Sequence, residues 1–111
     1  MSVPEKIEAN LSGVATKANV YFDGKVISRS IFFTDGSRQT LGLIFPGTYN
    51  FGTEKKEKMC VMAGSGKVKL KGEADFKTYS AGEHWFVDAS SSFDVEVSEG
   101  FFEYCCHYLD A

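Results

Sequence analysis

The sequence predicts a single all-β domain that closes into a barrel, with about nine or ten short strands and little helix. Three observations predict this fold class. β-branched and aromatic residues cluster in short runs, and several runs alternate with polar residues at the two-residue period of a strand. Turn-forming pairs separate the runs, among them Asp35-Gly36, Pro46-Gly47 and Ala81-Gly82. No long stretch carries apolar residues at helical spacing.

In the first half of the chain, each apolar run ends at one of these turns. The run before Asp35-Gly36 is β-branched and aromatic, and the turn after it indicates a hairpin. Aromatic residues alternate with smaller polar ones from Tyr49 onward, which gives that strand one aromatic face. The predicted strands cover residues 20–22, 26–34, 40–45 and 48–53.

In the second half, a charged run at 54–58 leads into an apolar strand, and Gly64-Ser65-Gly66 predicts a hairpin turn after it. The lysines of 67–71 alternate with apolar residues, so one face of that strand is solvated. The predicted strands cover residues 59–63, 67–71, 84–87, 93–97 and 102–108. Alternation in the last strand places four side chains on one face: Phe102, Tyr104, Cys106 and Tyr108.

The chain divides into an arm at 1–18 and a single barrel domain at 19–111. The arm has no clear period, and Pro4 can open one helical turn within it. Its start lacks a basic segment followed by an apolar one, so we expect no signal peptide and a cytoplasmic protein.

Charge and cysteine content exclude several classes of protein. A net charge of −3 disfavours nucleic acid as a partner, and the chain lacks the apolar run of a membrane span. Three cysteines, two of them adjacent, do not form a disulfide framework. Since neighbouring strand residues point to opposite faces, Cys105 and Cys106 should diverge, as expected in a reduced protein.

The two central blocks resemble the cupin barrel. Gly47 and Gly64 bracket a segment in which Glu57 stands where cupins carry a glutamate. The histidines of the cupin motifs are replaced, and neither His84 nor His107 falls at a ligand position. Several imidazoles converging on one ion are what a metal cupin requires. The resemblance therefore implies a cupin-like jelly roll without a metal.

A narrower resemblance covers residues 19–109. The ordered blocks are similar to the family of small pyrimidine/purine nucleoside phosphorylases, which are cupin-like proteins of about this length. The blocks are Asn19–Val26, Ser28, Asp35–Arg38, Thr40–Ile44, Pro46–Thr53, Glu57–Met59, Gly64, Ala81-Gly82, Trp85–Phe93 and Tyr104–Cys106. The chain departs from the family at Asp88 and Ser90, where a proline and an asparagine are usual.

This resemblance implies an enzyme, a pentosyltransferase. It would convert purine or pyrimidine nucleosides and phosphate into free base and pentose 1-phosphate. Phosphate is then a co-substrate, and neither a metal nor another cofactor is expected. The reaction must hold phosphate against the anomeric carbon, orient the ribose and stabilise the departing base.

The catalytic candidates are Arg38 and Glu57. Arg29 and Arg38 are the only arginines, and an arginine fork suits phosphate better than a lysine does. A solvated surface charge is the simpler interpretation for Arg29 and an equal alternative to the phosphate-binding role for Arg38. Glu57 shares a strand face with Met59, and if it points inward it can bind ribose hydroxyls or hold a proton for the base. Otherwise it is an exposed member of the charged run.

The substrate-binding candidates are aromatic or hydroxyl-bearing. Aromatic residues at strand period stack on a nucleobase or pack in the core, and both interpretations stand here. Thr53 can donate a hydroxyl hydrogen bond, and the loop serine Ser90 can contact phosphate. The predicted set is Tyr49, Phe51, Thr53, Met59, Phe86, Ser90, Phe93 and Tyr104.

Two other functions fit the same fold. One is a cupin-type protein that binds a nucleoside, a sugar or an anion without turnover. The other is a sugar isomerase, which usually needs a histidine base that this chain does not offer at a suitable position. The apolar edge at 20–22 also favours a homodimer.

Overall fold

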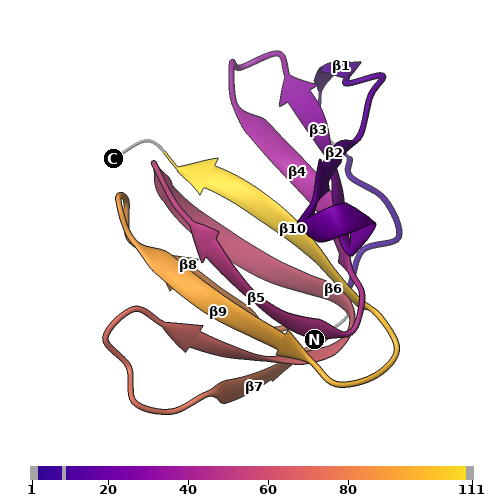
Figure 1. Cartoon of the computed structure of the whole chain (residues 1–111). Coiled ribbons are helices and arrows are strands. Elements are labelled where there is room, and N and C mark those ends of the chain that lie inside the picture. The colour runs from indigo at the N-terminus through magenta and orange to yellow at the C-terminus, as the bar shows by residue number, and fades with distance from the viewer. Residues whose placement is uncertain (1–2, 9, 110–111) are drawn as a thin grey trace.

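The computed structural model describes residues 3–8 and 10–109, and it confirms the all-β prediction. Ten strands are present in that part of the chain (Figure 1). They are β1 (Leu11–Val14), β2 (Asn19–Tyr21), β3 (Val26–Phe33), β4 (Arg38–Ile44), β5 (Gly47–Gly52), β6 (Lys56–Leu70), β7 (Lys77–Ser80), β8 (His84–Val87), β9 (Ser92–Val97) and β10 (Phe102–Leu109). The helical content of these residues is one 3-10 turn, η1 (Phe22–Gly24).

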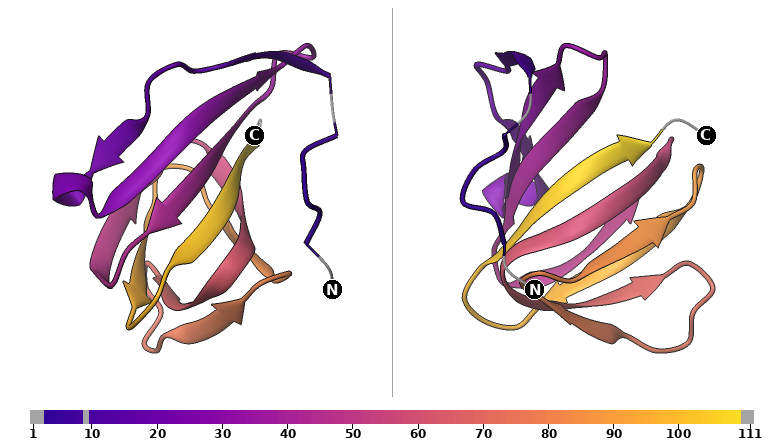
Figure 2. Two further views of the ribbon diagram at one scale, coloured as in Figure 1. Left: turned by 90° about the vertical axis from the view of Figure 1, so that its right-hand side faces the viewer. Right: turned by 180° about the vertical axis from the view of Figure 1, so that it is seen from behind.

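The strands form one strongly curled antiparallel sheet, and β6 connects its two halves. The hydrogen-bonded order is β1-β3-β4-β10-β6-β9-β5, with β2 on β3 and with β7 and β8 on β6. The first part of β6 pairs with β10 and β8, and its last part pairs with β7 and β9. Figure 2 shows how the long β6 bends so that β5 and β9 face β10 across the interior.

The predicted hairpin turn at Gly64-Ser65-Gly66 is wrong, because these residues lie inside β6. Gly64 has φ +75°, and the β6–β10 register shifts beside it. A Cβ at this position would overlap the carbonyl oxygen of Phe101. The extra residue of the bulge is Met62, which the register skips between Val61 and Ala63. Gly64, two residues farther along, has the positive φ that lets the strand turn from the first half of the sheet into the second.

The N-terminal segment also differs from the prediction of a loose arm with a helical turn. Leu11–Val14 is a strand that pairs with β3, and the segment around Pro4 is not helical. The edge of β3 offers unpaired backbone groups, which the segment satisfies without needing a buried face of its own. Residues 1, 2 and 9 of the predicted arm, and 110–111 of the predicted barrel domain, lie outside the described residues.

The side chains that face the interior change from large and apolar at one end of the barrel to small and polar at the other. At one end the rung across β3, β4 and β10 is Val26, Ile44 and Phe102, all fully buried. Farther along, small and polar residues replace these apolar ones. The small or polar residues on the same inward face include Ser28, Ser30, Gly42, Thr40, Cys106, Tyr108 and Glu57. The apolar core thus fills one end of the barrel and leaves space at the other.

Candidate functional site

The interior space is a cavity of about 460 Å³ at the polar end of the barrel. Strands from both halves of the sheet and the η1 turn form its wall. Its lining residues are Tyr21, Phe22, Ser28, Thr40, Asn50, Phe51, Gly52, Glu57, Met59, Phe93, Tyr104, Cys106 and Tyr108. Five of the residues predicted from the sequence are among them: Phe51, Glu57, Met59, Phe93 and Tyr104.

Glu57 points into the barrel, which is one of the two positions that the sequence left open for it. It is 9% exposed, and it pairs across β6 and β10 with Tyr108. Burial raises the pKa of its carboxyl group, and the hydrogen bond from the Cys106 thiol and the charge of Arg38 lower it by smaller amounts. The carboxyl group is therefore held closer to its protonated form than a solvated glutamate.

Hydroxyl and thiol groups surround this carboxyl on the β3–β4–β10 side. Tyr104 hydrogen-bonds with Ser28, and burial raises its pKa above the ordinary value. Thr40 Oγ1 and Tyr108 Oη are 3.4 Å apart. Each hydroxyl can donate or accept a hydrogen bond, so this wall can adapt to different polar groups of a ligand.

An aromatic wall faces the hydroxyl groups from β5, β9 and η1. The rings of Phe51 and Phe93 stack with centroids 5.4 Å apart, and the ring of Phe22 meets Phe51 edge-on at 5.6 Å. A planar base could stack on such a wall, since every nucleobase has a π-face. The predicted stacking role of Phe51 and Phe93 remains a prediction, which their position in the cavity favours.

A smaller cavity of about 300 Å³ adjoins the first. The two share Gly52, Glu57 and Tyr108, and the smaller one adds Arg38, Glu54 and Lys55. The centre of the Arg38 guanidinium lies 4.0 Å from the centroid of the Tyr108 ring. The predicted catalytic pair, Arg38 and Glu57, therefore lines one cavity although the two residues come from different strands.

Two of the predicted binding residues have their polar groups occupied by the protein itself. The Thr53 hydroxyl donates to the Asp88 carbonyl at 2.7 Å and accepts from the Ser91 amide at 2.9 Å. The Tyr49 hydroxyl donates to the carbonyls of Phe45 and Pro46 at 2.8 and 2.9 Å. In this geometry Thr53 holds a loop and Tyr49 holds a turn, and neither lines the two cavities.

Two further predicted residues lie away from the cavities. Phe86 is 49% exposed on β8, where its ring meets the His84 ring edge-on at 5.5 Å. Ser90 is exposed in the loop between β8 and β9 and has φ +53°, a conformation that a glycine or asparagine adopts more easily. The predicted surface position of His84 is confirmed.

Sequence reasoning missed several cavity residues. Alternation had placed Cys106 and Tyr108 on the face of Tyr104, but it did not show that this face lines a cavity. Thr40 and Ser28 belong to blocks of the family resemblance, but nothing in the sequence marked them as cavity residues, because small polar residues occur in most strands. Cross-strand pairing, as in Thr40 with Cys106, is what brings them to the site.

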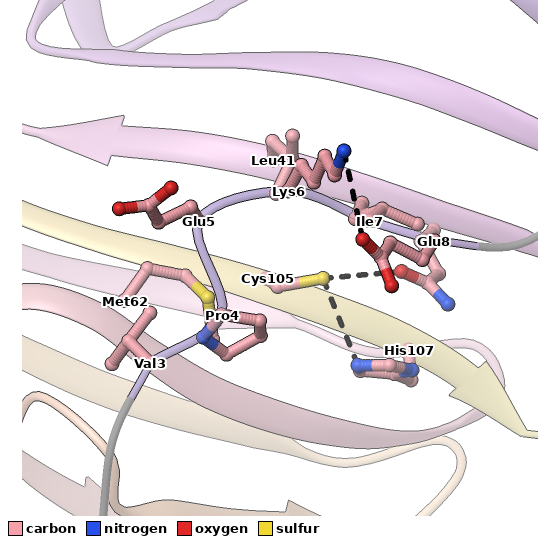
Figure 3. Close-up of a pocket in the computed structure, with 11 residues that line it drawn as sticks. Val3, Pro4, Glu5, Lys6, Ile7, Glu8, Leu41, Met62, Cys105 and His107 are labelled. Carbon is pink, nitrogen blue, oxygen red and sulfur yellow. Dashed lines mark hydrogen bonds and ion pairs between the residues drawn. The ribbon is translucent and has the colours of Figure 1, made fainter.

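A third cavity, of about 810 Å³, lies outside the barrel beneath the N-terminal segment (Figure 3). Val3–Glu8 cover the outer face of β4 and β10 there, over Leu41 and Cys105. The Cys105 thiol lies 3.7 Å from the His107 ring and donates to Gln39 at 3.3 Å. Burial raises the pKa of Cys105 to about 11, so this thiol is a weak nucleophile at neutral pH.

We take the interior cavity as the candidate site because it gathers the ionisable and aromatic groups that the sequence singled out. Cys105 and Cys106 diverge as predicted, with Cys105 at the outer cavity and Cys106 at the inner one, and all three cysteines are free. Within the described residues, no group of three or more His, Cys, Asp or Glu side chains is placed to hold a metal ion. No helix in that part of the chain is long and apolar enough to cross a membrane.

Comparison with known families identifies the family of the chain. The family model described as pyrimidine/purine nucleoside phosphorylase matches residues 16–108. A protein of that name from Paraburkholderia xenovorans (strain LB400) is 50% identical over 96 residues, which are 86% of this chain and 90% of the relative. The protein of that name from Aromatoleum aromaticum is 47% identical over 108 residues, or 97% and 99% of the two chains.

Solved structures agree in fold. A protein of unknown function from Acinetobacter sp. ADP1 superposes with a TM-score of 0.84 at 34% identity, over 87% of this chain and 93% of the other. Another, from Vibrio parahaemolyticus, gives a TM-score of 0.78 at 40% identity, over 91% and 100%. The cupin-like fold class predicted from the sequence is thereby confirmed.

Proposed function

Because the chain belongs to the pyrimidine/purine nucleoside phosphorylase family, we propose that it catalyses the reversible phosphorolysis of nucleosides. Phosphate attacks the anomeric carbon, the bond from that carbon to the base nitrogen breaks, and a new bond to a phosphate oxygen forms. The products are pentose 1-phosphate and a free base, which takes up a proton as it leaves. This chemistry makes the enzyme a pentosyltransferase.

One observation carries the proposal: the two adjoining cavities meet at Glu57, with an aromatic wall on one side and Arg38 on the other. The reaction needs a flat apolar surface for the base, a cation for phosphate and a group that holds a proton between them. The larger cavity fits the nucleoside, and the smaller one fits the phosphate. An anomeric carbon at the junction would then lie within reach of both.

The electrostatics suit an oxocarbenium-like transition state. Arg38 and Lys55 bring positive charge to the smaller cavity, which the carboxyl group of Glu54 also lines, and a phosphate dianion would lie against the two cations. Because burial raises the Glu57 pKa, its carboxyl can carry a proton toward the departing base and then accept one back. The adaptable hydroxyls of Ser28, Thr40 and Tyr104 can contact sugar or base edges of either nucleoside class.

The remaining expectations follow from this mechanism. Positive side chains supply the charge that phosphate needs, so we propose that the reaction is independent of metal and of organic cofactor. We also propose that the enzyme acts in cytoplasmic nucleoside salvage. Its partners are nucleosides and phosphate, and neither nucleic acid nor a membrane is required.

We propose further that the protein is a homodimer. Val20 on the edge strand β2 is 61% exposed, and the neighbouring Tyr21 and Phe22 are 45% and 44% exposed. An apolar edge of this kind is protected when it pairs with a second chain. Light scattering should give twice the mass of one chain, and the mass of a single chain would refute the dimer.

The experiment for the reaction is a panel of uridine, cytidine, thymidine, adenosine, guanosine and inosine, incubated with and without phosphate. Free base is followed by chromatography. Phosphate-dependent base release is the expected result, and Arg38→Ala and Glu57→Gln should each reduce it strongly. Arg29→Ala is the matched control, since this exposed arginine donates to the Ala15 carbonyl at 2.9 Å and lies outside the two interior cavities.

No base release from folded wild-type protein in ample phosphate would reject the phosphorylase. Nucleoside binding without turnover would then favour a cupin-type binding protein.

A further inference from the structure

Tyr108 occupies the junction between the two interior cavities and lines both of them. It lies on β10, the strand between β4 and β6, so it separates the strand of Arg38 from the strand of Glu57. Its Cα partner on β6 is Glu57 itself. On the other side, the Arg38 guanidinium lies over its ring at 4.0 Å.

The ring and the hydroxyl of Tyr108 make different contacts. The face of the ring attracts the guanidinium through its quadrupole, and a guanidinium loses little hydration in such a contact because it is weakly hydrated. The hydroxyl is 3.4 Å from Thr40 Oγ1, a long separation for a hydrogen bond. Tyr108 therefore contacts Arg38 through its ring and not through its hydroxyl group.

An ion pair between Arg38 and Glu57 is the alternative to the contact of Arg38 with the ring. Arg38 and Glu57 have opposite charges and line the same small cavity, yet no salt bridge joins them among the described residues. If the ring were absent, the flexible arginine could swing to the carboxylate. That ion pair would neutralise the cation meant for phosphate and would lower the Glu57 pKa.

We propose that Tyr108 is a positioning residue whose ring holds Arg38 toward phosphate and keeps it from pairing with Glu57. The proposal rests on the proposed function in taking the smaller cavity as the phosphate subsite. Tyr108 itself makes no bond to the reacting atoms. By keeping the two groups apart, Tyr108 leaves Arg38 available to bind phosphate and leaves the carboxyl group of Glu57 able to carry a proton.

The charged and titratable groups around Glu57 define what a pH experiment can report. Tyr108 and Cys106 face it from β10, Arg38 lies across the small cavity on β4, and its β8 neighbour Val87 does not titrate. The remaining charges at the small cavity are Glu54 and Lys55. Of these groups, Arg38 is the one that lies over the face of the Tyr108 ring. Replacing the ring should therefore change the distance between Arg38 and Glu57 more than the distance between Glu57 and any other charged group.

The test compares Tyr108→Phe, which keeps the ring, with Tyr108→Leu and Tyr108→Met, which remove it. Phe76→Leu is the matched control, because it removes an exposed ring that lies 5.3 Å beneath Lys69, outside the interior cavities. For each variant that unfolds near the wild-type temperature, KM is measured separately for phosphate and for nucleoside. The pH profile of kcat/KM and the binding of inorganic phosphate by calorimetry complete the set.

The ring-free variants should raise the phosphate KM about 2- to 30-fold, the range that a cation–π contact of this kind represents. The nucleoside KM should change less, and the alkaline limb of the kcat/KM profile should move to lower pH as the Glu57 pKa falls. Tyr108→Phe should retain the wild-type profile. Equal losses in the Phe and Leu variants, or an unchanged phosphate KM in the Leu and Met variants, would overturn the proposal.

The calorimetry separates this inference from the enzyme assignment. Weaker phosphate binding in the ring-free variants supports the positioning role even if no nucleoside is cleaved. Phosphorolysis with normal phosphate binding in those variants rejects the role and leaves the enzyme intact. Absence of phosphate binding by the wild-type protein would overturn the inference as well.

Discussion

Replacing Thr53 by valine should destabilise the protein without touching the cavity. The Thr53 hydroxyl anchors both ends of the loop between β8 and β9, because it donates to the Asp88 carbonyl and accepts from the Ser91 amide. Valine keeps the shape of the side chain and removes both hydrogen bonds. Thr53→Ser is the matched variant, since it keeps the hydroxyl and loses one methyl group.

The magnitude follows from these contacts. Each hydrogen bond contributes about 1 kcal/mol net, and a buried partner left unsatisfied costs about 1–3 kcal/mol more. Water can replace part of the bonding to Asp88, which is exposed, so the valine variant should lose about 2 kcal/mol. For a domain of this size, that loss lowers Tm by about 9 °C. The serine variant should lose about 1 kcal/mol, mostly through the missing methyl group.

Thermal unfolding followed by circular dichroism measures the difference, and the fluorescence of Trp85, the one tryptophan, gives a second probe. The same samples are assayed for phosphate-dependent base release below their transitions. A valine variant that unfolds at the wild-type temperature but has a raised nucleoside KM would refute this reasoning. It would restore the sequence-based expectation that the Thr53 hydroxyl contacts substrate.

Two other predictions concern the carboxyl group of Glu57 and the glycine at position 64. Burial raises the pKa of Glu57 above its value in the unfolded chain, so the folded state binds a proton more tightly than the unfolded state does. This proton binding contributes its full stabilisation below the unfolded pKa. The contribution is lost as pH rises through the folded pKa. Glu57→Gln should abolish this component of the pH dependence in chemical unfolding, and an unchanged slope would contradict it. Gly64→Ala should destabilise the protein by about 2–4 kcal/mol, since alanine is strained at φ +75° and its Cβ would meet the Phe101 carbonyl. Urea midpoints measure this loss, and a variant as stable as wild type would exclude the overlap.

The sequence predicted the strands well where a local turn determines their ends. Asp35 and Gly36 form the β3–β4 turn, with Gly36 at φ +89° and the Asp35 carboxyl accepting from the Ser37 amide at 2.8 Å. Gly64 also has a positive φ and a glycine-rich neighbourhood, yet it lies inside β6, next to the bulge at Met62. What distinguishes the two is the backbone of Phe101, which lies far along the chain, so local pattern could not predict the outcome.

The candidate site was predictable to the extent that it depends on alternation. Glu57, Met59 and Tyr104 face the interior because their strands alternate, and the cavity contains all three. Hydroxyl groups were less predictable. Thr53 bonds to residues 35 and 38 positions away, so sequence pattern could not show that its hydroxyl was already occupied.

The cavity itself follows from residue volume rather than from any motif. Gly42 stands on the inward face of β4 between Ser28 on β3 and Tyr104 on β10. A Cβ at Gly42 would overlap the Tyr104 ring, so the glycine lets that ring lie flat against the sheet. Ser28, on the same rung as Gly42, and Thr40, on the next rung, replace the large apolar residues that close the other end of the barrel. Because the core lacks volume only at this end, the polar groups of β10 and β6 meet an open space, and the position of the site follows.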